Sequence, residues 1–216
     1  MKKLSLILIL VSLFHAGFAN EAYHETMSQS IDKLFKVTTV AEYIETANQF
    51  ERIARIEKEE WLPLYYASYA YIMISYEEPD NTKKDAYLDQ AQKYLDQAMA
   101  IEPSESELHM LQGFLYPSRI TIDPMTRGME YMARMNASLD KALQLNPDNP
   151  RVYFLRGTMT YHMPEAYGGG AANALPLLKT AREKFSVFKP QTDLSPNWGK
   201  EGNEADLKKA LEEVKE

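Results

Sequence analysis

Cysteine is absent from all 216 residues of this chain. Its absence excludes disulfide bonds, zinc sites built on thiolates and cysteine nucleophiles. Histidine is scarce, with four in the chain, and no two have the His-x3-His spacing that directs both imidazoles toward one metal. An excess of positive charge is also lacking, because 24 Lys and Arg stand against 31 Asp and Glu, a net charge of −7. An acidic chain repels phosphate backbones, so we expect no sequence-independent binding of nucleic acid.

The motifs of common enzyme classes are missing as well. No G-x-x-x-x-G-K-[ST] segment could cradle phosphates, and no G-x-S-x-G turn could present a nucleophilic serine. The glycine run at residues 168–170 has no lysine or serine beside it, which favours a surface insert over a phosphate-binding loop. The sequence therefore predicts a protein that is not an enzyme and that uses no cofactor and no metal.

The N-terminus has the features of a secretory signal peptide. Lys2 and Lys3 precede an apolar run over residues 4–14, and Gly17 and Ala19 supply small residues before a cleavage point. The run is shorter than the ~20 residues that span a bilayer, which favours cleavage over a membrane anchor. We therefore expect residues 1–19 to be removed as a signal peptide. The mature chain should then be periplasmic or secreted, without a membrane span.

The rest of the sequence contains a repeated helical unit. Three segments carry small and large apolar residues at spacings of three and four, followed by a proline: residues 91–103, 135–147 and 174–190. These spacings keep the apolar residues on one helix face, and the proline stops the helix because it lacks an N–H group. Each segment follows another apolar stretch of helical character. The sequence therefore predicts paired helices.

Glycines mark where neighbouring helices should meet. Gly113 and Gly157 lie inside predicted helices, where glycine costs about 1 kcal/mol relative to alanine. We expect each to let an alanine of the paired helix pack directly on the backbone. The interval from Ala98 to Gly113 equals that from Ala142 to Gly157. This constant register between units is what stacking requires, because each unit buries its apolar face only on its neighbours.

The pattern resembles the tetratricopeptide repeat (TPR) family, whose helix–turn–helix unit reads W-x2-L-G-x2-Y…A-x3-F…P. Gly113-x2-Tyr116 is similar to the first half of that motif. Residues 91–103, with Ala-x3-Leu-x2-Ala-x4-Pro, are similar to the second half. The two halves are further apart than in the family, so the loop within each unit should be lengthened. The inserts would lie at roughly residues 77–86, 119–130 and 163–173 and cluster along one edge.

The resemblance implies an all-α fold, an α-solenoid in which stacked helix–turn–helix units form a right-handed superhelix. The TPR-like domain would span residues 20–190, beginning with a helix over residues 24–37. Residues 191–216 would form a linker and a C-terminal capping helix, with Asn203 as the N-cap. We expect Trp198 in the linker to be buried against the last repeat.

The aromatic residues indicate where a partner could bind. Five of the fourteen tyrosines crowd the segment from residue 65 to residue 76, more than one buried stripe would hold. In TPR arrays the first helix of each unit lines the concave surface, so the resemblance implies an aromatic groove. The predicted partner-binding residues are Tyr71, Ser75, Met110, Phe114, Ser118, Arg151, Phe154, Thr158, Tyr161 and His162.

Two functions of different classes fit this reading. The first is a non-enzymatic TPR scaffold that binds an envelope protein or an extended peptide through the groove and the clustered inserts. The alternative is a carrier for an apolar small molecule, associated with a transporter, in which the inserts and residues 195–198 close one end of the groove. An enclosed cavity with two or more aromatic residues would favour the carrier, and an open trough would favour protein binding.

Overall fold

The computed structural model describes residues 21–215, so the predicted signal peptide at residues 1–19 lies outside the described residues. Within the described part every regular element is a helix and no strand occurs, which confirms the predicted all-α class. The first helix covers residues 21–34, close to its predicted position. The other elements are α2 Val40–Ile56, α3 Leu62–Glu77, α4 Asn81–Ile101, α5 Ser106–Ile122, α6 Pro124–Leu145, α7 Pro150–His162, the 3-10 helix η1 Glu165–Tyr167, α8 Ala171–Val187 and α9 Lys200–Glu213.

Short polar side chains determine where several helices begin. At the start of α2, the Thr39 hydroxyl accepts a hydrogen bond from the Glu42 N–H and the Glu42 carboxylate accepts one from the Thr39 N–H. Asp80 accepts hydrogen bonds from two N–H groups in the first turn of α4. Asn149 caps α7, and Pro150 follows at the first helical position, where its missing N–H costs nothing. Local sequence thus sets these helix starts.

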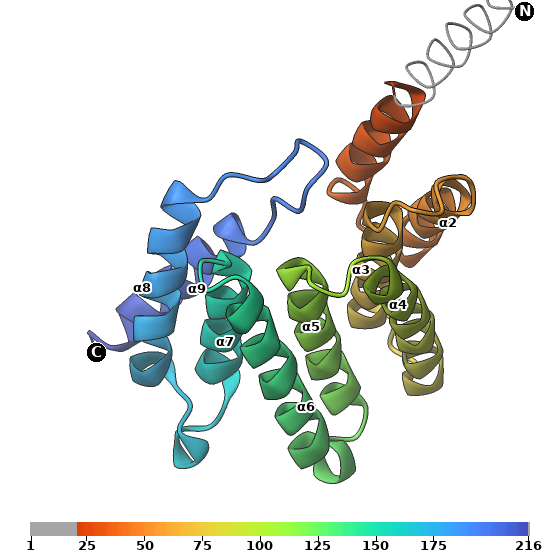
Figure 1. The fold of residues 1–216 in the computed structure, drawn as a ribbon. Helices are drawn as coiled ribbons and strands as arrows, with labels where there is room; N and C mark the ends of the chain where they lie inside the picture. The colour runs from red at the N-terminus through yellow and green to blue at the C-terminus, as the bar shows by residue number, and fades with distance from the viewer. Residues whose placement is uncertain (1–20, 216) are drawn as a thin grey trace, which may run out of the picture.

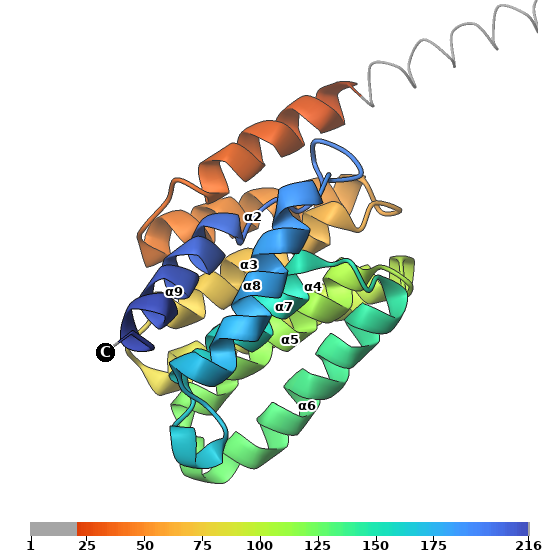
Figure 2. The same cartoon turned by 90° about the vertical axis from the view of Figure 1, so that its left-hand side faces the viewer.

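The helices stack as consecutive pairs (Figure 1). α3 packs against α4, α5 against α6 and α7 against α8, and the first helices α3, α5 and α7 contact one another in series. The helix over residues 21–34 lies beside α2, and α9 covers α7 and α8 at the other end (Figure 2). This is the predicted α-solenoid, closed by a C-terminal capping helix. In the described part no helix is both long and apolar enough to span a bilayer.

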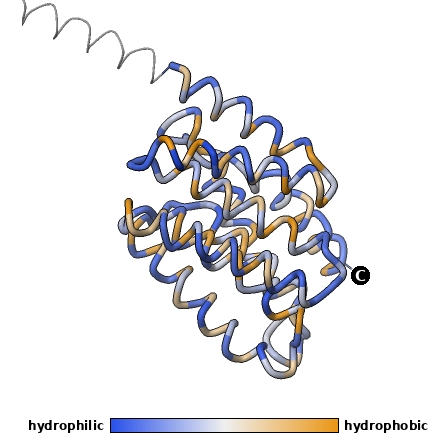
Figure 3. The backbone as a smooth tube through the Cα atoms, turned by 90° about the vertical axis from the view of Figure 1, so that its right-hand side faces the viewer, coloured by the Kyte–Doolittle hydropathy of each residue, from blue (hydrophilic) through white to orange (hydrophobic). Residues whose placement is uncertain are grey.

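The core is centred on α3. Of its 16 residues, 13 are buried, whereas α4 and α6 bury only one stripe each. Hydrophobic and hydrophilic residues accordingly alternate along the outer helices (Figure 3). A helix that is hydrophobic on all sides must be covered on all sides. Here α2, α4 and α5 surround α3, and Leu194 from the C-terminal part of the chain joins the same core.

Gly113 and Gly157 lie where paired helices approach closely, as predicted, but leucines rather than alanines contact them. A Cβ atom at Gly113 would lie 2.5 Å from Leu139 Cδ2 of α6. One at Gly157 would lie 2.6 Å from Leu178 Cδ2 of α8. The leucine of each second helix therefore inserts toward the backbone of the first helix. The predicted alanine contact is wrong because the longer side chain reaches further across the interface.

The predicted inserts lie at the turns within the units, along one edge of the array (Figure 1). In the first two units the added residues mostly lengthen helices, and in the third they form η1 and a glycine turn. Asp85 joins the first two inserts, since its carboxylate accepts hydrogen bonds from Arg119 Nη1 at 2.6 Å and from Arg127 Nη2 at 2.7 Å. The Arg127 hydrogen bond foremost, with help from Arg119, lowers the pKa of Asp85. The ion pairs of Asp85 therefore connect the first two inserts along this edge.

The C-terminal segment departs from two predictions. α9 begins at Lys200, directly after Gly199, whose φ of 100° lets the chain turn sharply. Asn203 is therefore not the N-cap; it is buried inside α9, and its side-chain amide donates to the Leu178 carbonyl at 3.1 Å. Trp198 packs on α3 and α5 as well as beside Arg151 of the last repeat, so it is not buried against the last repeat alone, because the preceding residues run back across the first helices.

Candidate functional site

Four of the predicted partner-binding residues are buried in the core. Tyr71 turns toward α4, stacks on Tyr94 and donates a hydrogen bond to Glu51 at 2.8 Å. Hydrogen bonding to the Glu51 carboxylate adds to the effect of burial, and together they raise the pKa of Tyr71. The hydroxyls of Ser75 and Ser118 lie 2.7 Å apart, sealed between α3 and α5. Met110 is equally buried. These side chains hold neighbouring helices together and leave no surface for a partner.

The predicted residues on α7 are mostly covered by α9. Phe154 packs so closely on α9 that a Cβ atom at Gly202 would lie 2.8 Å from its ring. The Thr158 hydroxyl donates to Asp206 at 2.7 Å, and the Tyr161 hydroxyl donates to Glu213. The chain thus occupies this part of the predicted groove with its own capping helix. His162, at the C-terminal end of α7, is exposed and packs edge-on against Tyr161.

Arg151 lies at the start of α7 and is fully buried. Its guanidinium donates two hydrogen bonds to Glu107 of α5, from Nη2 to Oε1 at 2.6 Å and from Nε to Oε2 at 2.7 Å. Burial alone would lower the pKa of Arg151, but the Glu107 carboxylate outweighs it and the pKa is raised. Nη1 also donates to the Trp198 carbonyl, and the guanidinium lies over the Phe188 ring. The ion pair therefore joins two repeats and the C-terminal segment.

The uncovered part of the inner face carries an aromatic cluster, which comprises Phe35, Tyr69, Tyr76, Phe114 and Trp198. Trp198 is central, with its ring centroid 5.0 Å from that of Tyr69 and 5.4 Å from that of Phe114. Tyr69 lies two residues before Tyr71, so it points away from α4, on the opposite side of α3. Phe35 and Tyr76 border the cluster and are 46% and 41% exposed. Of the predicted residues, only Phe114 belongs to it.

Two hydroxyl groups of the aromatic cluster are available to a ligand. The hydroxyls of Tyr69 and Tyr76 form no hydrogen bond to any residue that the structure describes. Burial raises the pKa of both phenols above the usual 10.0, although the Tyr76 ring remains partly exposed. Both are therefore neutral at physiological pH and can donate a proton to an acceptor on a ligand.

Residues 188–199 form what we call the strap, which crosses the inner face without regular secondary structure. Its Leu194 carbonyl accepts a hydrogen bond from the buried Tyr66 hydroxyl at 2.8 Å. The Trp198 indole N–H donates to the Tyr65 hydroxyl at 2.9 Å. His24 of the first helix pairs with Asp193 at 2.7 Å. The strap thus connects residues far apart in the sequence and forms one wall of the aromatic cluster.

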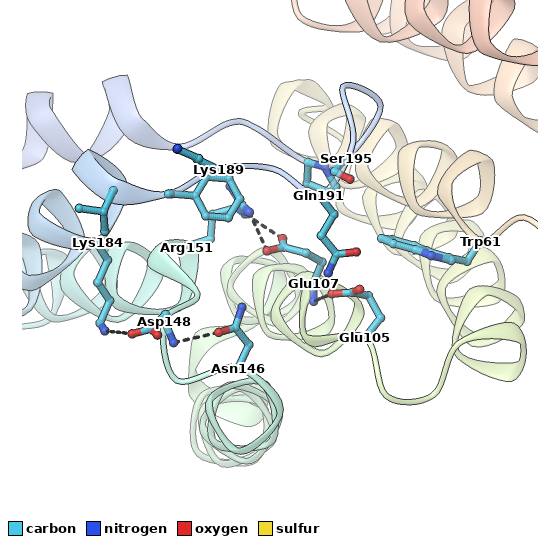
Figure 4. Close-up of a pocket in the computed structure, with 13 residues that line it drawn as sticks. Trp61, Glu105, Glu107, Asn146, Asp148, Arg151, Lys184, Lys189, Gln191 and Ser195 are labelled. Carbon is cyan, nitrogen blue, oxygen red and sulfur yellow. Dashed lines mark hydrogen bonds and ion pairs between the residues drawn. The ribbon is translucent and has the colours of Figure 1, made fainter.

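Beside the strap lies a second feature, the edge cleft, at the N-terminal ends of α3, α5 and α7 (Figure 4). It has a volume of about 410 Å³, within the range of small-molecule sites. Two aromatic residues, Trp61 and Phe188, line it, and Ser195 and Pro196 of the strap close one side. The Arg151–Glu107 pair also borders it. The two aromatic residues and the strap wall match part of the arrangement expected for a small-molecule carrier, whereas the cleft is open to solvent and no residue of the predicted inserts lines it.

Comparison with known proteins places the chain in a family. Residues 27–167 match the family described as regulator of microtubule dynamics protein 1-3. The chain belongs to this family. The matching family is thus a different one from the TPR family that the sequence resembles, although the helical repeat arrangement is as predicted. No curated protein sequence matches the chain.

Two solved structures are similar to this family member. The HusA haemophore from Porphyromonas gingivalis shares 28% sequence identity, with a TM-score of 0.79 over 90% of this chain and 95% of that one. TTC0263, a thermophilic TPR protein from Thermus thermophilus, shares 17% identity, with a TM-score of 0.46 over 88% of this chain and 98% of that one. The similarity to HusA, which is named a haemophore, thus extends over nearly the whole of both chains.

Sequence reasoning missed most of the aromatic cluster and the buried ion pair. Phe35 and Tyr69 carry no motif, and the sequence predicts a different neighbour for Trp198. One available signal was position in the repeat, because Glu107 precedes Arg151 by 44 residues, the same interval that separates Gly113 from Gly157. Oppositely charged residues at equivalent positions of adjacent repeats are expected to face each other when the register is constant. That signal predicts the ion pair but not its burial.

Proposed function

We propose that this protein is an exported carrier that binds a flat, largely apolar ring of the tetrapyrrole class, such as haem, on the aromatic cluster. The observation that carries the proposal is the cluster itself: Trp198 packs on Tyr69 and Phe114, and the partly exposed rings of Phe35 and Tyr76 border them on the inner face. Flat ligands gain free energy by stacking on aromatic side chains and covering their apolar surface. The similarity to HusA, which is named a haemophore, supports this ligand class.

The inner face favours a compact ligand over an extended peptide. A peptide or envelope protein that lies along the groove would need a continuous trough past α3, α5 and α7. The strap covers the first part of that path, where its own Leu194 side chain is buried in the core, and α9 covers Phe154 on α7. The carrier function is therefore our first proposal. An envelope protein or transporter that receives the ligand is the partner we expect for it.

The described residues favour binding of the ring over coordination of an iron atom. His24 pairs with Asp193, His109 lies 3.0 Å from the Pro103 carbonyl, and His162 packs on Tyr161. The phenols of the cluster are neutral, because burial raises their pKa, whereas a tyrosine that ligates iron must lose its proton. We therefore expect iron-free protoporphyrin IX to bind about as tightly as ferric haem.

A titration of the mature chain tests this proposal. Ferric haem and protoporphyrin IX are each added while tryptophan fluorescence and porphyrin absorbance are recorded, and Trp198 fluorescence should be quenched on binding. Tyr76→Ala and Phe35→Ala each remove one ring at the border of the cluster, so each should weaken binding about tenfold. Because both side chains are more than 40% exposed, both variants should fold normally.

Tyr167→Ala is the matched control, since Tyr167 is 79% exposed in η1, away from the cluster. Its affinity should equal that of the unmodified chain. If neither porphyrin binds, or if all three variants bind alike, the aromatic cluster is not a tetrapyrrole site. A peptide that competes with the porphyrin would instead favour the scaffold function.

A further inference from the structure

The edge cleft lies on the other side of the strap from the aromatic cluster, and its charges are unevenly paired. Arg151 is neutralised by Glu107, and Lys184 by Asp148 at 2.8 Å. Glu105 has no cation within ion-pair distance among the described residues. Its carboxylate accepts one hydrogen bond, from the Glu107 N–H at 3.0 Å, where it caps α5. One acid in the cleft is therefore left without compensation.

The environment of Glu105 disfavours its ionised form as long as no cation lies beside it. The residue is half-buried, and burial raises the pKa of its carboxyl, with a further contribution from the charges of Glu107 and Glu102; the hydrogen bond from the Glu107 N–H and the charge of Arg151 oppose this rise without cancelling it. A cation beside Glu105 would favour the ionised carboxylate and so oppose the rise in its pKa. Lys189 lies on the opposite side of the cleft, with its amine turned away from Glu105 (Figure 4).

An aromatic side chain lies on the same side of the cleft as this acid. Trp61, Gln191 and Glu105 lie on the same side of the cleft (Figure 4). The Trp61 indole N–H donates to no group in the described part of the chain, and its ring packs edge-on against Tyr65 with centroids 5.8 Å apart. Pro196 of the strap adds a further apolar wall. An indole ring beside a carboxylate is a combination that binds organic cations, since both attract positive charge.

We propose that the edge cleft is a second binding site, which takes a small organic cation with an apolar body, such as an aryl-alkyl ammonium. The ammonium group would pair with Glu105 and lie against Trp61, and the apolar body would extend toward Phe188 and Pro196. The site is separate from the aromatic cluster and does not depend on tetrapyrrole binding.

Two probes of equal shape and opposite charge test the site. Phenethylamine and 3-phenylpropionate are titrated into the ¹⁵N-labelled mature chain, and the two indole N–H signals are assigned with Trp198→Phe. We expect phenethylamine to shift the Trp61 signal and leave the Trp198 signal in place. We expect 3-phenylpropionate to bind at least tenfold more weakly.

Glu105→Gln removes the charge but keeps an oxygen that can cap α5, and it should weaken phenethylamine binding about tenfold. Glu102→Gln is the matched control, because it removes a nearby charge that does not line the cleft, and it should leave binding unchanged. Should Glu105→Gln fail to fold, Trp61→Leu keeps the acid and should also weaken binding, which is then measured from the backbone amide signals of the labelled chain. Equal or tighter binding of 3-phenylpropionate, or unchanged affinity in both cleft variants, would overturn the proposal.

Discussion

Arg151→Met is the substitution that most directly tests how the repeats are joined. Methionine keeps much of the length and removes the guanidinium, which leaves the Glu107 carboxylate buried without its counter-ion. Breaking one partner of a buried ion pair costs about 3–5 kcal/mol, because the remaining charge stays desolvated. Domains of this size are stable by about 5–15 kcal/mol, so a fifth or more of the stability is at stake. The midpoint of thermal unfolding should fall by roughly 6–20 °C.

Urea unfolding, followed by circular dichroism and tryptophan fluorescence, measures this loss. Arg156→Met is the matched control on the same helix, because Arg156 pairs with the exposed Asp140. That pair should contribute less than about 1 kcal/mol. If both arginine variants lose the same small amount, burial does not set the strength of the Arg151–Glu107 pair.

Removing both charges measures how strongly the two residues of the pair interact with each other. In Arg151→Met/Glu107→Gln no buried charge remains, and the glutamine can still accept the hydrogen bond that Asn149 donates to Glu107. The double variant should therefore be more stable than the sum of the two single losses predicts, by about 1–3 kcal/mol. Simple additivity of the two losses would refute the argument.

Two further predictions concern the edge of the inserts and the capping helix. The pKa of Asp85 is lowered, so its ion pairs contribute stability above the usual pKa of 3.8 and lose it as the pH falls through the lower folded-state pKa. Asp85→Asn should cost about 1 kcal/mol at pH 7, and urea unfolding should show this cost shrinking toward pH 3; a constant cost would contradict it. Gly202→Leu should push α9 off Phe154, at a cost of about 1–3 kcal/mol, and hydrogen exchange should rise over residues 200–213. Gly128→Leu is its control, since a Cβ atom there meets nothing within 4 Å, and equal protection in both variants would count against close packing of α9.

The paired helices could be predicted because the information is local and repeated. Small and large apolar residues at spacings of three and four define each helix face, and prolines or capping residues define the ends. The constant interval to Gly113 and Gly157 predicted that a neighbouring helix approaches at those points, and it does. The contacting residue was not predictable from that interval, because Leu139 and Ala142 lie on the same face of α6 and only side-chain reach distinguishes them.

The predicted groove depended on how the helices pack on one another, which local spacing does not specify. Register placed Ser75, Met110 and Ser118 on the inner face, but helix stacking turns these positions into the core between α3 and α5. The position of the strap was also unpredictable, since the Tyr66–Leu194 hydrogen bond joins residues 128 positions apart. A linker of polar residues, prolines and glycine has no periodicity from which its path could be inferred.

The sequence by itself determined the helical class, the pairing of helices and their constant register, because periodicity and helix ends depend on residues a few positions apart. Only the tertiary structure decided which tyrosines are buried, that the strap and α9 cover much of the inner face, and that Glu105 is left without a cation. Those features depend on contacts between residues far apart in the chain. Such contacts form because all the helices must share one core, and no local pattern records which side chains that core leaves exposed.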